Sequence, residues 1–208
     1  MKTWLTTLSV AAALAYGPVQ AAGEVKPGDA KAGEAKSAAC LACHGPMGNS
    51  VVPMWPKLAG QHPEYLQKQL MDFKANNRAN EQMTPMAMPL SDQDVADLAA
   101  YFGSQQQAPG TPGAADAAGL GERLFRGGNA ATGVPACSGC HGAQGSGLGL
   151  AKFPRISGQH AQYVEQTLKH FRDGARKNDP NGMMRGVAAR MTDQEIAAVA
   201  QYLQGINP

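Results

Sequence analysis

The sequence has little excess charge of either sign and no long apolar run beyond its N-terminus. It contains 18 Lys and Arg against 16 Asp and Glu in 208 residues, a formal net charge of +2. This near balance, without a basic stripe, does not indicate nucleic-acid binding. No stretch reaches the roughly 20 apolar residues that a membrane-spanning helix needs. We therefore expect the mature protein to be soluble.

The first 21 residues have the pattern of a secretory signal peptide. Lys2 gives a positive start, residues 5–14 form a short apolar run, and Val19-Gln20-Ala21 resembles a cleavage site. Cleavage there predicts export and a periplasmic location, and it leaves 17 basic and 16 acidic residues. An uncleaved N-terminal anchor is the alternative, but the apolar run is short for one.

Cysteine is scarce, and all four cysteines lie in two copies of one motif. The copies are Cys40-Leu41-Ala42-Cys43-His44 and Cys137-Ser138-Gly139-Cys140-His141. Cys-x-x-Cys-His is the attachment signature of haem c, in which two thioether bonds hold one porphyrin edge. The adjacent His then lies under the iron as the proximal ligand. The motifs predict two haem c groups, with His44 and His141 on the irons.

Three other roles for these cysteines are compatible with the pattern. Two Cys-x-x-Cys pairs could form a zinc site, but here they lie 97 residues apart and each is followed by His. A thioredoxin-like redox pair needs a βαβ context, and no strand pattern is present. Structural disulfides suit an exported protein but leave both histidines unexplained. The haem interpretation accounts for all of these residues.

The two motifs belong to a tandem repeat that covers most of the chain. Pro56-Lys57-Leu58-Ala59-Gly60-Gln61-His62 matches Pro154-Arg155-Ile156-Ser157-Gly158-Gln159-His160, and Ala32-Gly33-Glu34 matches Leu120-Gly121-Glu122. Residues 105–113 have the composition of a linker. We predict a first domain over residues 22–106, a linker over 107–115 and a second domain over 116–208. Each half is small for a self-sufficient core, and a covalent haem would help to fill it.

Each half has the pattern of three helices and no strand, which predicts an all-α fold. The expected helices cover residues 29–39, 63–75 and 92–103, and then 116–126, 161–173 and 193–204. Apolar stripes at helical spacing mark the middle helices: Leu66, Leu70 and Phe73, then Val164, Leu168 and Phe171. Ser91 with Asp94, and Thr192 with Glu195, indicate capping boxes before the last helices.

The sixth iron ligand is best assigned to methionine, the usual partner of His in electron-transfer cytochromes. At the spacing of 101 residues set by Ser91 and Thr192, only Met83 pairs with another Met, which is Met184. Both are expected in loops before the last helix. Met86 and Met183 are the second choices, and we interpret Met71, Met86, Met88 and Met191 as core gap-fillers.

His62 and His160 would be the ligands if both irons had two His ligands. Each directly precedes a predicted helix, so we favour helix-entry roles for them, which are compatible with capping. His170 has no match in the other half and is expected on the surface.

Two prolines are placed to orient the proximal histidines. Pro56 lies 12 residues after His44, and Pro154 lies 13 after His141. A ligating His normally donates its second ring N–H to an acceptor such as a carbonyl. Proline has a fixed φ, so it can hold its carbonyl rigidly for this bond; a plain turn role is the alternative. Trp55 and Arg185 are candidates either for binding the haem propionates or for the surface.

The sequence resembles the dihaem cytochrome c4 family over essentially the whole mature chain. The resemblance rests on the tandem motifs and on four strings: Pro-Lys-Leu-Ala-Gly-Gln, Pro-Leu-Ser-Asp-Gln-Asp, Leu-Phe-Arg-Gly-Gly and Met-Arg-Gly-Val-Ala-Ala. It implies two class I cytochrome c domains with the haems near each other at the domain interface. It also implies His/Met ligation with Met83 and Met184 at the family's Met positions.

The resemblance further implies a periplasmic electron carrier in a respiratory chain, not an enzyme. A quinol-oxidising complex would be its donor and a terminal oxidase its acceptor, with loose peripheral association with the membrane. Two alternative functions fit the same motifs: a dihaem peroxidase-like enzyme, which needs one open iron position, and a haem subunit of a larger oxidoreductase. The matched methionines favour the carrier.

Overall fold

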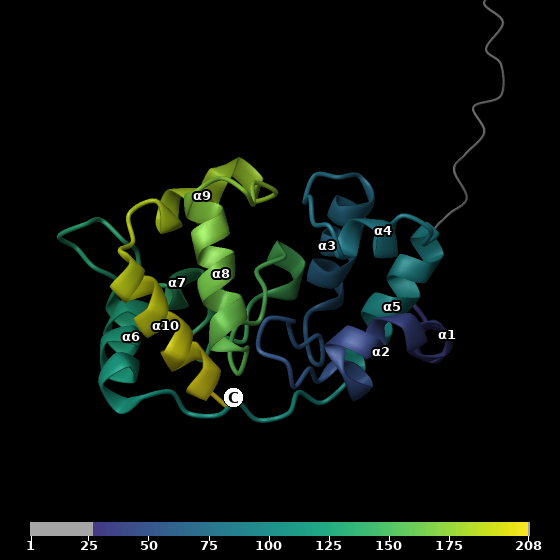
Figure 1. The fold of residues 1–208 in the computed structure, drawn as a ribbon, viewed down its shortest axis with the longest axis horizontal. Coiled ribbons are helices and arrows are strands. Elements are labelled where there is room, and N and C mark those ends of the chain that lie inside the picture. The colour runs from purple at the N-terminus through teal and green to yellow at the C-terminus, as the bar shows by residue number, and fades with distance from the viewer. Residues whose placement is uncertain (1–26, 208) are drawn as a thin grey trace, which may run out of the picture.

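The computed structural model describes residues 27–207, so the predicted signal peptide lies outside the described residues. Two helical halves lie side by side, and the segment between α5 and α6 runs along one edge of both (Figure 1). The first half contains α1 (Ala30–Lys36), α2 (Ala38–His44), η1 (Pro46–Gly48), α3 (Pro63–Lys74), α4 (Met83–Ala87) and α5 (Asp92–Ser104). The second contains α6 (Ala115–Gly127), α7 (Ser138–His141), η2 (Gly149–Ala151), α8 (Ala161–Arg172), η3 (Pro180–Gly182), α9 (Met183–Ala188) and α10 (Asp193–Gly205).

The predicted all-α fold is confirmed. Between residues 27 and 207 the only β-type pairings are two isolated bridges, Asn129 with Val134 and Leu148 with Phe153. In that same range, no helix has the length and apolar character needed to cross a bilayer. Two local predictions were wrong. The helix expected over 29–39 ends at Lys36, and the loops expected around Met83 and Met184 are the short helices α4 and α9.

The first and last helices of each half, α1 with α5 and α6 with α10, cross at very short range because each crossing contains a glycine. A Cβ atom on Gly33 of α1 would lie 2.1 Å from the Asp97 carbonyl of α5. A Cβ atom on Gly121 of α6 would lie 2.1 Å from the Ala198 carbonyl of α10. Only glycine permits backbones to approach this closely. The glycine repeated in the two halves, Gly33 and Gly121, is therefore a packing requirement.

The middle helices bury the stripes predicted for them. Leu66 and Phe73 of α3, and Val164, Leu168 and Phe171 of α8, are buried, and Leu70 packs against the N-terminal core. Both capping boxes are present at the starts of α5 and α10. Each half therefore has its own apolar core, and a capped last helix closes each core: α5 in the first half and α10 in the second.

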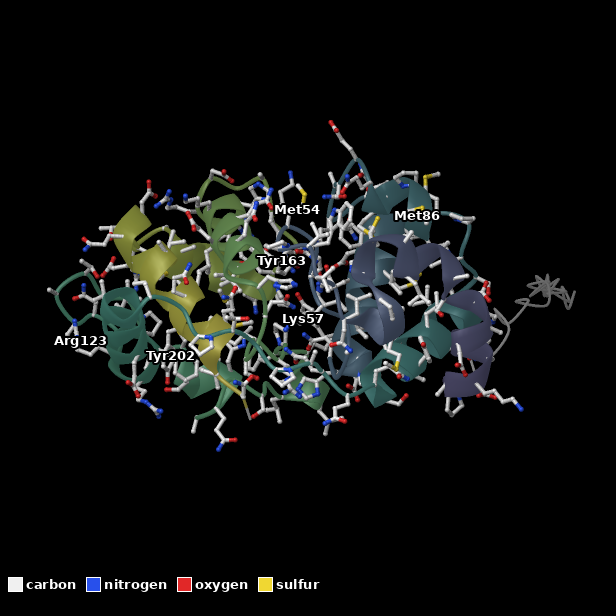
Figure 2. The ribbon with its side chains drawn as sticks, turned by 60° about the horizontal axis from the view of Figure 1, so that its bottom comes forward. Met54, Lys57, Met86, Arg123, Tyr163 and Tyr202 are labelled. Atoms are coloured by element: carbon white, nitrogen blue, oxygen red, sulfur yellow. The ribbon has the colours of Figure 1, made fainter. Side chains whose placement is uncertain are left out.

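Two buried glutamines join the halves through paired backbone contacts. Gln61 Nε2 donates to the Arg155 carbonyl at 2.8 Å, and its Oε1 accepts from the Arg155 N–H at 2.9 Å. Gln159 makes the same two bonds to the backbone of Lys57, both at 2.9 Å. The contacts are related by the sequence repeat, so the interface has approximate two-fold symmetry. Figure 2 shows Lys57 at the boundary between the halves.

His62 and His160 lie at helix starts, as predicted, but their side chains do not cap the helices. Both occupy the N-cap positions of α3 and α8, but neither side chain makes a capping bond. Instead, Nε2 of His62 donates to the Ser146 carbonyl at 2.7 Å, and Nε2 of His160 donates to the Ser50 carbonyl at 2.8 Å. These bonds cross between the halves, so the histidines hold the interface. His170 is exposed, as expected.

Candidate functional site

The motif histidines are buried at the ends of short helices and face proline carbonyls. His44 is the last residue of α2, and His141 is the last residue of α7. Nδ1 of His44 lies 2.8 Å from the Pro56 carbonyl oxygen, and Nδ1 of His141 lies 2.9 Å from that of Pro154. A carbonyl can only accept, so each Nδ1 carries the proton. The lone pair of each ring is therefore on Nε2, the nitrogen available to a metal.

Both imidazoles are held in the neutral form that binds metals. Burial lowers the pKa of His44, and the bond to Pro56 only partly opposes this effect. Burial lowers the pKa of His141 in the same way, against the bond to Pro154. A neutral ring with its proton fixed on Nδ1 needs no deprotonation before Nε2 coordinates a metal.

The four cysteines are free of disulfides and are placed differently within each motif. Cys40 and Cys137 are half-buried against the cores of their own halves, whereas Cys43 and Cys140 are exposed. Burial raises the pKa of the Cys40 thiol, and it raises that of Cys137 to about 11. Among the residues that the structure describes, no three His, Cys, Asp or Glu side chains converge on one point, so the cysteine pairs remain apart.

The paired methionines lie in the first turns of two short helices, α4 and α9, that precede the last long helices. Met83 begins α4 and is half-buried, with its backbone N–H bonded to Asn80 Oδ1 at 2.8 Å. Met184, on α9, packs against the same core as Cys137. The second choices, Met86 and Met183, are exposed.

Of the methionines interpreted as core gap-fillers, only Met191 is buried. The prediction was wrong for Met71, Met86 and Met88, which lie on exposed parts of α3 and α4 or directly after α4.

Two buried donors indicate where the acidic edge of a haem would be received. Trp55 Nε1 and Arg155 Nε are buried and have no hydrogen-bond partner among the described residues. Buried N–H groups are seldom left unpaired, and carboxylate oxygens such as haem propionates would satisfy both. Burial also lowers the pKa of the Arg155 guanidinium, so an acidic partner would stabilise its charge. Together with the free thiols and Nε2 atoms, these donors fit a haem in each half.

Of the residues that line the site and the interface, the sequence alone identified only some. Trp55 was a candidate from its position beside Pro56, whereas Arg155 could have been found as the match of Lys57 in the repeat. Arg185, the other propionate candidate, is paired with Asp179, with 2.8 Å between Nε and Oδ1. The repeated Gln61 and Gln159 were visible in the alignment, but nothing in the sequence indicated their partners.

Comparison with known proteins agrees with this geometry. The cytochrome c family model matches residues 30–106 and again 120–207. Cytochrome c4 of Thiocapsa roseopersicina is 70% identical over 184 residues, which cover 86% of this chain and 94% of that protein. The crystal structure of reduced recombinant cytochrome c4 from Pseudomonas stutzeri superposes with a TM-score of 0.84 at 48% identity, covering 86% of this chain and 100% of that one.

A more distant relative has a more specific description. The thiosulfate dehydrogenase electron acceptor of Thiomonas intermedia is 44% identical over 181 residues, covering 83% of this chain and 82% of that protein. The doubled family match, the close relatives and the shared fold lead to one conclusion. The chain belongs to the cytochrome c4 family of electron carriers, with two cytochrome c domains and two haem c groups as its cofactors.

Proposed function

We propose that each half holds one haem c and that His and Met are its axial ligands. Cys40 and Cys43 form the thioether bonds of the first haem, with His44 and Met83 on the iron. Cys137 and Cys140 form those of the second, with His141 and Met184. The observation that carries this proposal is the pair of bonds from the motif histidines to Pro56 and Pro154, which leave Nε2 for iron in both halves.

The chain's own residues keep the site ready for one-electron transfer. A haem c with His and Met ligands supplies a reversible Fe(III)/Fe(II) couple, and the thioether favours Fe(II). The rigid carbonyls of Pro56 and Pro154 fix the ring planes and keep both Nδ1 atoms protonated. Trp55 and Arg155 bind the propionates. With both axial positions filled, neither iron offers a place for a substrate, so the protein is a carrier and not an enzyme.

The mature protein acts in the periplasm, after removal of residues 1–21, and donates electrons to a terminal oxidase. Its domains comprise residues 22–106 and 116–208, joined by the linker 107–115. A quinol-oxidising complex is one donor. The relative described as a thiosulfate dehydrogenase electron acceptor supports a second donor class, a thiosulfate-oxidising enzyme. Reduction of the purified protein by each donor, measured by stopped-flow absorbance, distinguishes the two.

Carbon monoxide distinguishes a carrier from a peroxidase-like enzyme. Intact mass and haem staining after denaturing electrophoresis should show two covalent haems per chain. The reduced protein should then show no spectral change under carbon monoxide, because both sixth positions are occupied. Ready binding at one haem would reverse the conclusion and assign that half an open, catalytic iron.

A further inference from the structure

One peptide group connects the proximal histidine of each half to a glutamine of the other half. The Pro56 carbonyl and the Lys57 N–H belong to the same peptide bond. Its oxygen accepts from His44 Nδ1 at 2.8 Å, and its N–H donates to Gln159 Oε1 at 2.9 Å. The chain of hydrogen bonds therefore runs from Gln159 in the second half to His44 in the first.

The same arrangement occurs in the opposite direction. The peptide between Pro154 and Arg155 accepts from His141 Nδ1 at 2.9 Å and donates to Gln61 Oε1 at 2.9 Å. Gln61 belongs to the first half and His141 to the second. An arrangement that appears twice, related by the repeat, is a property of the interface and not an accident of one loop.

The orientation of each amide is fixed by its second bond. Gln159 Nε2 donates to the Lys57 carbonyl, and Gln61 Nε2 donates to the Arg155 carbonyl. Turning either amide over would place its NH₂ group against an N–H and its oxygen against a carbonyl, so only one orientation is satisfied. Both glutamines are 7% exposed, so water competes little for these bonds.

Hydrogen bonds on the two ends of one peptide strengthen each other, because accepting from the N–H polarises the carbonyl. A more polarised carbonyl draws the Nδ1 proton more strongly and makes Nε2 a better electron donor to a metal. We propose that Gln159 and Gln61 are positioning residues that each set the reduction potential of the haem in the opposite half. The inference rests on the proposed function, in which His44 and His141 are the proximal ligands.

The sign of the effect follows from the charge on iron. A stronger imidazole donor stabilises Fe(III) more than Fe(II) and lowers the reduction potential. Loss of the glutamine oxygen reduces the polarisation of the proline carbonyl and so weakens the bond that this carbonyl accepts from the histidine. The reduction potential of the haem in the other half therefore rises. The haem in the glutamine's own half keeps its histidine–proline bond, and the peptide group in that bond is still held by the other glutamine. The potential of that haem is therefore unchanged.

Gln159→Met in the full-length holoprotein tests the proposal, since Met has a similar length and offers the Lys57 N–H only a weakly accepting sulfur in place of an amide oxygen. Redox titration followed by NMR of the haem methyl resonances assigns a midpoint potential to each haem. We expect the first haem to rise and the second to remain unchanged, with the His44 Nδ1–H resonance of the reduced protein moving upfield. Gln61→Met should give the reverse assignment.

Gln107→Met is the matched control, because Gln107 Nε2 donates to the Ser157 carbonyl at 2.9 Å at the same boundary and touches neither peptide. It should move neither potential. Gln61→Met, which should raise the potential of the second haem and leave that of the first unchanged, provides a second test if Gln159→Met folds poorly.

The inference is overturned if Gln159→Met moves the second haem instead, moves both haems equally, or leaves both unchanged. Failure of the proposed function is a separate result. It would show in the parent protein, as fewer than two covalent haems or as histidine resonances without the signature of iron ligation.

Discussion

The guanidinium of Arg176 donates to the hydroxyl of Tyr65 across the boundary between the halves, at 3.0 Å. Arg78 returns the equivalent bond to Tyr163 at 3.1 Å. Each guanidinium also lies over a phenylalanine of its own half, Arg78 over Phe73 and Arg176 over Phe171. These exchanged bonds add charged donors to the glutamine and histidine contacts, so relative motion of the halves would break several buried bonds at once.

Gln69 gives this part of the interface an asymmetric centre. Its Oε1 accepts from Arg78 at 2.9 Å, from Arg176 at 2.9 Å and from Asn178 at 3.0 Å. The repeat places Thr167 at the equivalent position of the second half, where no side chain of this reach is available. One amide therefore collects donors from both halves.

Tyr163 should ionise at unusually low pH. Burial raises the pKa of Tyr163, but the charges of Arg78 and Arg176 outweigh this and lower it to about 8. The difference in near-ultraviolet absorbance between the parent protein and Tyr163→Phe should titrate near that pH. A midpoint near 10, the ordinary value for tyrosine, would contradict the arrangement.

The same shift predicts how stability depends on pH. Between about pH 8 and pH 10 the unfolded chain holds the tyrosine proton more tightly than the folded protein, so the contribution of Tyr163 to stability rises with pH. It is lost as the pH falls through about 8. Guanidinium unfolding of the parent protein and of Tyr163→Phe across this window should show the two free energies diverging towards high pH.

Arg176→Met should destabilise the protein by about 1–3 kcal/mol, because the buried hydrogen bonds of a charged donor to Tyr65, Gln69 and Asn178 are lost. Tyr65 and Gln69 both lose a donor, and water cannot easily replace it. Arg123→Met is the control, because Arg123 is exposed on α6 at the far end of the second half (Figure 2). Its effect should stay within about 0.5 kcal/mol. Equal losses in the two variants would show that the exchanged bonds contribute nothing specific.

Met83→Ala and Met184→Ala should each remove about half of the weak far-red absorption band that marks a Met–Fe(III) bond. Each should also lower the midpoint potential of one haem, because the thioether stabilises Fe(II). Met86→Ala and Met183→Ala are the matched controls from the same short helices and should leave the band intact. Loss of the band in a control would move the ligand assignment to that residue.

Gly121→Ala should cost about 1–3 kcal/mol, because the new methyl group would meet the Ala198 carbonyl in a tightly packed crossing. Gly119→Ala lies on the same helix, where the nearest atom to a Cβ is Arg123 Nη1 at 3.9 Å. It should be neutral or stabilising by up to about 1 kcal/mol, since alanine favours the helix. Thermal unfolding compares the two, and a similar loss in both would remove the crossing as the cause.

The sequence predicts best where the signal is local. The haem motifs, the helical stripes and the capping boxes are each written within a few residues. The break at Ser37 is harder, because its hydroxyl donates to the Glu34 carbonyl at 2.8 Å and competes with helical bonding. A serine within a helical pattern does not by itself reveal which bond it makes.

The interface could not be predicted, because its partners are far apart in the chain. Gln159 binds a backbone 102 residues away, and Gln61 binds one 94 residues away. His62 and His160 show the same limit. Their positions before helices suggested capping, while their true acceptors lie in the loop that follows the other half's motif.

The paired contacts of the glutamines and histidines bear on how the two halves of such a protein can diverge in evolution. In an assembly of two identical chains, every substitution at a symmetric boundary appears on both sides at once. Once two copies are joined in one chain, each side can be altered alone. In the repeat, Trp55 corresponds to Phe153, Lys57 to Arg155 and Gln69 to Thr167. Duplication with fusion thus allows two originally equivalent redox centres to acquire different properties while the boundary between them is preserved.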